Sequence, residues 1–189
     1  ILNQKVVNLS QVKKNINYAM IISTNSGLWR YKIGDTIEFT SLDPFRIKIT
    51  GRTKNFINAF GEELIIENAE KAIEKTLLKH KLSVVEYTVA PYFMKKKRSG
   101  FHQWLIEFKN PPKDLIKFKK DLDLNIQNTN SDYRAKRFKN IAMSEIEVIV
   151  ARKNQFYDWL KAKKKLGGQN KVPRLCNDRK LIDELLRLN

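Results

Sequence analysis

The hydrophobic positions of the first fifty residues alternate with polar ones over short stretches. Residues 18–24 form a short apolar run that ends at Asn25-Ser26-Gly27, and residues 36–39 and 45–50 alternate with a period of two. This period is typical of half-exposed β-strands, and the intervening Gly, Pro and Asn residues are typical of turns. A few strands can bury only a small hydrophobic core among themselves. We therefore expect this part to be the β-rich end of a larger domain.

After residue 51 the pattern changes to helical spacing interrupted by strands. A hairpin-like stretch runs to residue 63. Helices are predicted at 67–79, 114–128, 155–165 and 179–188, and strands at 84–90, 101–108 and 145–150. In the second strand, Trp104, Ile106 and Phe108 point to one face and Leu105 to the other. This order predicts an α+β fold, in which helices cover a small mixed β-sheet.

The segment from Gly51 to Asn55 separates the two patterns and is the best candidate for a domain boundary. It divides the chain into residues 1–50 and residues 51–189. The chain opens with Ile-Leu-Asn and no Met, which suggests that it is a fragment of a longer protein.

Charge is the strongest feature of the composition, with 37 Lys and Arg against 20 Asp and Glu and a net charge of +17. One interpretation is an anionic partner such as a nucleotide, a nucleic acid or a membrane phosphate. The other is a codon bias toward Lys, Asn and Ile, which favours a bacterial source. Aromatic residues do not alternate with the basic ones in the manner of RNA-binding sheets, so we expect no nucleic-acid partner.

The number of cysteines and the length of the apolar runs indicate the cellular location of the protein. Cys176 is the only cysteine, which excludes an internal disulfide and favours a reducing, cytoplasmic location. With only two histidines beside it, we expect no metal site. No run approaches eighteen apolar residues, so we expect no membrane partner.

Several self-sufficient active sites can be excluded. The sequence has no G-x-x-x-x-G-K-S/T loop, no G-x-G-x-x-G, no G-x-S-x-G and no H-E-x-x-H. Cys176 has no histidine base nearby in sequence and is expected to be an inert thiol. Glu62 and Glu63 are adjacent, which on a strand directs them to opposite faces.

Three segments remain as candidates for chemistry. Residues 27–35 end in Gly34-Asp35, where an exposed carboxylate could accept hydrogen bonds from a ribose diol or simply form a turn. Residues 51–55 contain Gly51-Arg52. Residues 166–176 combine flexible glycines with Lys171 and Arg174 on either side of a rigid proline, which could bring a cation to a phosphate or form a solvated surface loop.

In this order, the segments resemble the auxin-responsive Gretchen Hagen family of acyl-acid amido synthetases, a branch of the adenylate-forming enzymes. The resemblance covers residues 22–186. It rests on Thr24 to Asp35, on Asn130-Ser131-Asp132-Tyr133-Arg134-Ala135-Lys136-Arg137, and on residues 167–176 with Lys-Val-Pro-Arg. The last segment departs from the plant pattern, because Gln169-Asn170 precede the lysine and Leu175 is inserted before Cys176.

The resemblance implies that the full-length parent is a ligase that uses ATP and magnesium to adenylate a carboxylic acid. The acyl group then passes to the amine of an amino acid, which releases AMP. It implies that Asp35 binds the ribose, that Tyr31 lies beside the nucleotide and that Arg52 contacts ribose or phosphate or braces the turn. Lys171 is the implied catalytic cation, with Arg174 as the alternative.

The resemblance also implies how the chain is divided. Residues 1–50 would end the large N-terminal adenylation domain, and residues 51–189 would form a mobile C-terminal domain that turns about a hinge at Thr53, Lys54 and Asn55. The acyl pocket, the phosphate loop and the magnesium ligands would lie outside this chain. The chain alone is therefore expected to be inactive.

Three alternatives to this function remain open. An acyl-CoA ligase would share the Gly-Asp and Gly-Arg features but not Lys-Val-Pro-Arg. A basic nucleic-acid-binding module would show affinity that falls steeply with salt. A purely structural domain would dock on the large domain without Lys171 ever reaching a nucleotide.

Overall fold

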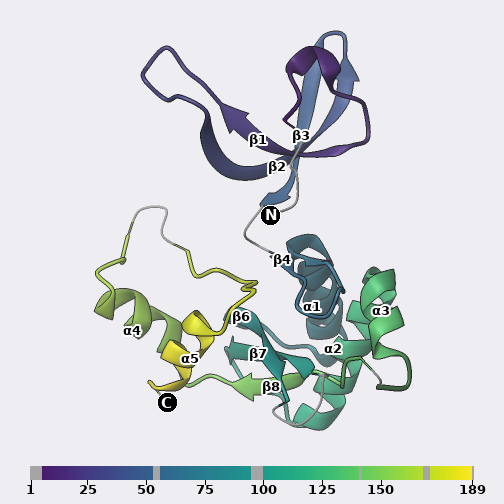
Figure 1. Cartoon of the computed structure of the whole chain (residues 1–189). Coiled ribbons are helices and arrows are strands. Elements are labelled where there is room, and N and C mark those ends of the chain that lie inside the picture. Colours follow the sequence, from purple (N-terminus) through teal and green to yellow (C-terminus); the bar gives the residue numbers. More distant parts are fainter. Residues whose placement is uncertain (1–5, 53–55, 95–99, 141, 168–170, 189) are drawn as a thin grey trace. The chain divides into compact units, whose positions relative to one another are not determined.

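The computed structural model describes residues 6–52, 56–94, 100–140, 142–167 and 171–188 (Figure 1). The chain forms two compact units, one of residues 1–54 and the other of residues 55–189. Among the described residues, no helix combines the length and the apolar character that crossing a membrane requires.

The first unit is a three-stranded antiparallel sheet in the order β1-β2-β3, preceded by one turn of 3-10 helix at Leu9–Gln11. Its strands are β1 (Asn17–Ile22), β2 (Tyr31–Leu42) and β3 (Phe45–Arg52). The ring of Phe39 is buried and packs edge-on against Tyr18 and Phe45, with 6.0 Å between centroids in each pair.

The apolar face of this sheet is only partly covered. Ile47 and Ile49 on β3 lie opposite Phe39 and Ile37 on β2. The two β2 residues are buried, whereas Ile47 and Ile49 are 49% and 66% exposed. The unit therefore buries few large side chains among its own described residues.

The second unit is built on a mixed three-stranded sheet. Strands β6 (Val84–Phe93) and β7 (Gly100–Phe108) pair antiparallel, and β8 (Glu147–Val150) pairs parallel with β7. A short hairpin of β4 (Phe56–Ile57) and β5 (Leu64–Ile65) precedes the first helix. The predicted α+β class and mixed sheet are confirmed.

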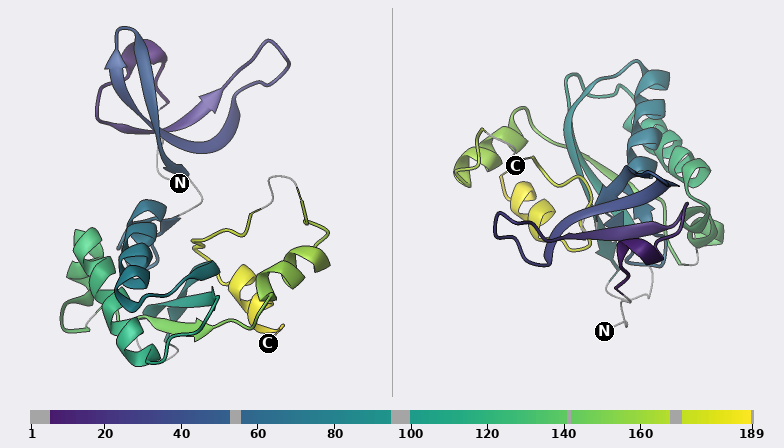
Figure 2. Two further views of the ribbon diagram at one scale, coloured as in Figure 1. Left: turned by 180° about the vertical axis from the view of Figure 1, so that it is seen from behind. Right: turned by 90° about the horizontal axis from the view of Figure 1, so that it is seen from above.

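Helices cover both faces of this sheet (Figure 2). On one face lie α1 (Ile66–His80), α2 (Leu115–Thr129) and α3 (Ser131–Arg137), and on the other α4 (Gln155–Ala162) and α5 (Lys180–Leu186). The predicted facing of β7 is correct, because Trp104, Ile106 and Phe108 belong to the first core and Leu105 to the second.

Apart from element ends that are shifted by a few residues, two elements differ from the sequence-based prediction. Helix α3 was not predicted; it begins because the side chain of Asn130 accepts a hydrogen bond from the backbone N–H of Tyr133 at 2.7 Å, which caps its first turn. Strand β2 was expected to be interrupted at Gly34, but it continues through that residue as a bulge.

A buried carboxylate–imidazole pair supports the turn before β5. Glu62 and His102 both have fully buried side chains, and Nε2 of His102 lies 2.7 Å from Oε1 of Glu62. The carboxylate also accepts backbone N–H bonds from Ala59 at 3.2 Å and Phe60 at 2.6 Å. Burial acts to raise the pKa of Glu62, but the contacts with His102 and the backbone donors outweigh it, and the pKa is lowered.

The lowered pKa predicts a loss of stability in acid. A carboxylate with a depressed pKa in the folded state stabilises fully above its unfolded pKa, and this contribution disappears as the pH falls through the folded value. We therefore expect the free energy of unfolding to decrease as the pH falls below 4.5, the ordinary pKa of glutamate. In Glu62→Gln this decrease should be smaller, because glutamine does not titrate. Urea unfolding at several pH values measures this.

The neighbouring Glu63 provides the control, because its side chain is exposed. Glu63→Gln should leave the acid dependence of unfolding close to that of the unchanged chain. An identical acid dependence in the Glu62→Gln and Glu63→Gln variants would contradict the assignment.

Candidate functional site

Asp35 lies in a bulge of the central strand of the first unit. The register between β1 and β2 shifts between Ala19, which lies opposite Thr36, and Ile21, which lies opposite Lys32. Strand β2 therefore has more residues than β1 across this interval, including Gly34 with φ of +90°. Glycine adopts this conformation without the Cβ clash of other residues. Bulges redirect side chains and are frequent beside functional sites.

The same strand brings together two of the residues singled out in the sequence. Asp35 is the register partner of Arg52 across the antiparallel β2–β3 pair. Tyr31, at the start of β2, lies opposite Ile22 and is 51% exposed. The predicted nucleotide-binding residues thus lie on adjacent strands of one sheet, while the predicted hinge residues Thr53, Lys54 and Asn55 lie outside the described residues.

In the second unit, the Lys-Val-Pro-Arg segment lies along the edge strand β6. The N–H of Val89 donates to the carbonyl of Arg174 at 2.8 Å, and the N–H of Cys176 donates to the carbonyl of Val89 at 3.0 Å. These bonds form a parallel bridge between Val89 and Leu175. The sheet is therefore extended at its β6 edge by a segment that sequence patterning assigned to a loop.

The two cations of this segment have different surroundings. Nη1 of Arg174 lies 2.6 Å from Oε1 of Glu70 on α1, and its Nε lies 3.4 Å from Oε1 of Glu86 on β6. Lys171 is exposed. Arg174 thus forms ion pairs within its own unit. Lys171 is therefore the better candidate for binding an anion from outside the chain.

Cys176 follows this segment and is partly buried. Burial raises the pKa of its thiol above the ordinary value. A raised pKa reduces the fraction of thiolate at neutral pH, which is the form that acts as a nucleophile.

The 130–137 motif builds an internal network instead of a ligand site. The hydroxyl of Tyr133 donates to Oδ1 of Asp123 at 2.7 Å, and Nη2 of Arg137 lies 2.9 Å from Oδ2 of the same carboxylate. All three side chains are nearly or fully buried. Burial raises the pKa of Tyr133 well above the ordinary value, and the adjacent Asp123 raises it further, so the phenol stays protonated.

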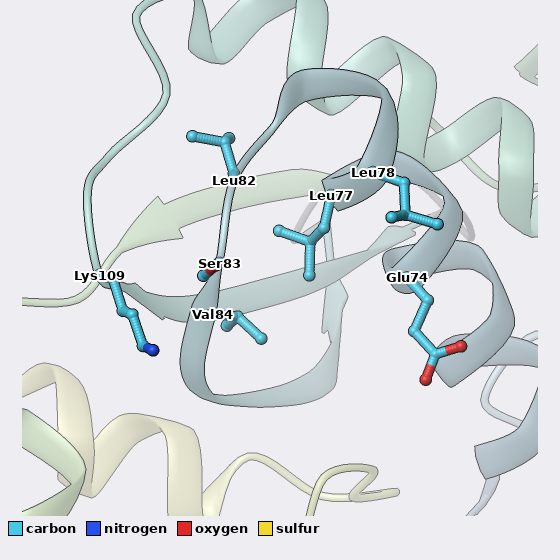
Figure 3. Close-up of a pocket in the computed structure, with 7 residues that line it drawn as sticks. All are labelled: Glu74, Leu77, Leu78, Leu82, Ser83, Val84 and Lys109. Carbon is cyan, nitrogen blue, oxygen red and sulfur yellow. The ribbon is translucent and has the colours of Figure 1, made fainter.

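An open depression of about 520 Å³ lies at the C-terminal end of α1 (Figure 3). Its apolar lining consists of Leu77, Leu78, Leu82 and Val84, with Glu74 and Lys109 on opposite sides. None of the site residues predicted from the sequence lines it. It contains no convergent set of polar groups of the kind that orients a ligand.

The partners of Arg174 could not have been identified from the sequence. Glu70 and Glu86 precede it by 104 and 88 residues, and both appear in the sequence as ordinary polar positions. Only the pairing of residues 174–176 with β6 brings them together.

The second unit is thus an α+β domain whose small mixed sheet is extended by residues 174–176. The sequence model for the GH3 family C-terminal domain matches residues 67–180, and that for the GH3 family central domain matches residues 2–52. The chain therefore belongs to the GH3 family, the auxin-responsive family that its motifs resemble.

Individual relatives agree with this assignment. The chain is 26% identical to the indole-3-acetic acid-amido synthetase GH3.3 of Arabidopsis thaliana over 96% of its own length. It is similar in fold to the solved structure of the GH3.15 acyl acid amido synthetase, with a TM-score of 0.73 at 20% identity over 96% of the chain. A second solved structure, of AtGH3.15 in complex with 2,4-DB, gives a TM-score of 0.69 at 19% identity.

The chain spans about a third of the length of these relatives, 32% of GH3.3 and 35% of GH3.15. The two parts of the chain match different parts of the family, its central and its C-terminal domain.

Proposed function

We propose that the chain is the C-terminal part of an ATP-dependent acyl-acid amido synthetase. In the first half-reaction, a carboxylate oxygen attacks the α-phosphorus of ATP, the bond to the β-phosphate breaks and pyrophosphate leaves. In the second, an amine of an amino acid attacks the acyl carbon, loses a proton and displaces AMP. Adenylation is needed because AMP is a far better leaving group than hydroxide.

The observation that carries this proposal is the match of both units to successive domains of one family of amido synthetases. It is supported by the exposed Lys171 at the end of a fixed segment and by a carboxylate at a strand bulge. In the proposed reaction Asp35 accepts hydrogen bonds from the ribose hydroxyls, and Tyr31 and Arg52 contact the nucleotide. Lys171 neutralises the charge that develops on the α-phosphate.

We further propose that the first unit ends the large adenylation domain, that the second unit forms the mobile domain and that residues 53–55 are the hinge, because β3 of the first unit continues to Arg52. Among the described residues, no group of three His, Cys, Asp or Glu side chains is arranged to hold a metal ion. The magnesium that accompanies ATP would be bound by residues outside this chain.

The experiment that tests the function compares the full-length protein with residues 1–189. The full-length protein should catalyse acid-dependent exchange between ATP and pyrophosphate and should form amides when amino acids are supplied. Residues 1–189 alone should catalyse neither. Exchange by residues 1–189 would place the active site within this chain, and a thioester formed with coenzyme A in place of an amide would establish an acyl-CoA ligase.

Asp35→Asn in the full-length protein is expected to weaken ATP binding about tenfold. The substitution keeps the shape of the side chain but removes the charge that strengthens hydrogen bonds from hydroxyl donors. Equilibrium titration with ATP measures the change. Glu38→Gln is the matched control, since Glu38 lies on the same strand β2 and loses the same charge. Equal effects of the two substitutions would indicate a nonspecific electrostatic contribution.

A further inference from the structure

The backbone that follows Lys171 is held by the second core and by strand β6. Val172 is 5% exposed and packs in the second core. The hydroxyl of Thr88 donates to the carbonyl of Pro173 at 2.8 Å. Together with the bonds between Val89 and residues 174–176, these contacts hold the segment along β6.

The side chain of Arg174 joins this segment to the helical layer. Its guanidinium pairs with Glu70 on α1 and Glu86 on β6, and its Cζ lies 5.0 Å from the centroid of the Tyr87 ring. A guanidinium over an aromatic face and between carboxylates is held by both geometry and charge. Two carboxylates around one cation also make this position unfavourable for a phosphate.

A second attachment links the segment to the beginning of the unit. Asn177 donates from its side-chain amide to the carbonyl of Phe56 at 2.8 Å and accepts from the N–H of Asn58 at 2.9 Å. Strand β4, which contains Phe56, is the first described element after residues 53–55. The residues after Lys171 are thus bound to β6, to α1 and to β4.

We infer that Arg174 is a positioning residue that fixes the backbone from which Lys171 extends toward the phosphate. This inference rests on the proposed function and assigns distinct roles to the two cations of the Lys-Val-Pro-Arg segment. Lys171 contacts the nucleotide, whereas Arg174 contacts only protein. Placement matters because a shift of about 1 Å in a group that aligns reactants can cost on the order of a hundredfold in rate.

The kinetic test is a double-variant cycle in the full-length protein. Arg174→Ala is expected to slow ATP–pyrophosphate exchange about tenfold, through kcat, with the KM for ATP nearly unchanged. Arg174→Lys should restore part of the rate. Because Arg174 acts through Lys171, adding Arg174→Ala to Lys171→Ala should cause no further loss.

A second measurement reports docking without relying on activity. The backbone N–H groups of Val89 and Cys176 form the two hydrogen bonds between β6 and this segment. Hydrogen exchange at these two amides should be at least about tenfold faster in Arg174→Ala. The matched control is Arg152→Ala. Arg152 pairs with Asp158 at 2.7 Å and is 43% exposed, against 41% for Arg174, so its removal should leave both the rate and these amides unchanged.

The outcomes separate this inference from the proposed function. If the unchanged full-length protein catalyses no exchange, the proposed function is wrong and the inference is wrong with it. If that protein is active but the losses from the two substitutions multiply, Arg174 acts independently of Lys171 and only the inference is overturned. Unchanged protection of Val89 and Cys176 in Arg174→Ala would also overturn it.

Discussion

Replacing Lys171 with alanine in the full-length protein is expected to slow adenylation on the order of a hundredfold. The ammonium group would offset charge that grows on the phosphate oxygens as the carboxylate attacks, and losing one such contact typically costs about 3 kcal/mol of transition-state stabilisation. Transfer of the acyl group from a preformed adenylate to an amine should be affected much less, since the charge on phosphorus is then already established. Pyrophosphate exchange and single-turnover amide formation measure the two steps.

Lys165 supplies the control for this experiment. It is an exposed lysine six residues upstream, just after α4, so Lys165→Ala removes the same charge from nearby surface. Its exchange rate should remain within about twofold of the unchanged protein. Equal losses in both variants would mean that overall positive charge, and not the position of Lys171, is what matters.

Arg137→Ala is expected to destabilise the second unit by about 3–5 kcal/mol. The side chains of Arg137 and Asp123 are 9% and 5% exposed, so the substitution would leave a buried carboxylate without its counter-ion. The remaining contacts of Asp123 with Tyr133 and Gln127 cannot neutralise it. Urea unfolding followed by the fluorescence of the fully buried Trp104 measures the loss.

Arg134 on the same helix α3 provides a control of identical chemistry. Its side chain is exposed, so Arg134→Ala should change the free energy of unfolding by less than about 0.5 kcal/mol. Similar losses in the two variants would show that helix propensity or total charge, and not the buried pair, sets the stability.

Periodicity alone predicted much of the second unit. The helix at 67–79 was predicted from an apolar face of Ile66, Ala69, Ala72, Ile73 and Leu77; the last four are buried in α1, and Ile66 is half-buried. The alternation around Leu105 correctly predicted that β7 faces two cores. These features are local, because each depends on residues within a few positions of one another.

Features that depend on distant residues could not be predicted in this way. Helix α3 depends on the cap from Asn130 and on the contact between Tyr133 and Asp123, ten residues earlier. The docking of residues 174–176 depends on β6, which lies more than eighty residues away in sequence. Of the candidate site, the sequence identified the cations but not their partners, so the distinction between Lys171 and Arg174 required the structure.

The pairing of residues 174–176 with β6 also protects the sheet from other chains. An uncovered edge strand presents free N–H and C=O groups, which can recruit a strand from another molecule. Here both the N–H and the C=O group of Val89 are hydrogen-bonded to this segment. Substitutions that release this segment would therefore be expected to promote aggregation as well as to slow the proposed reaction.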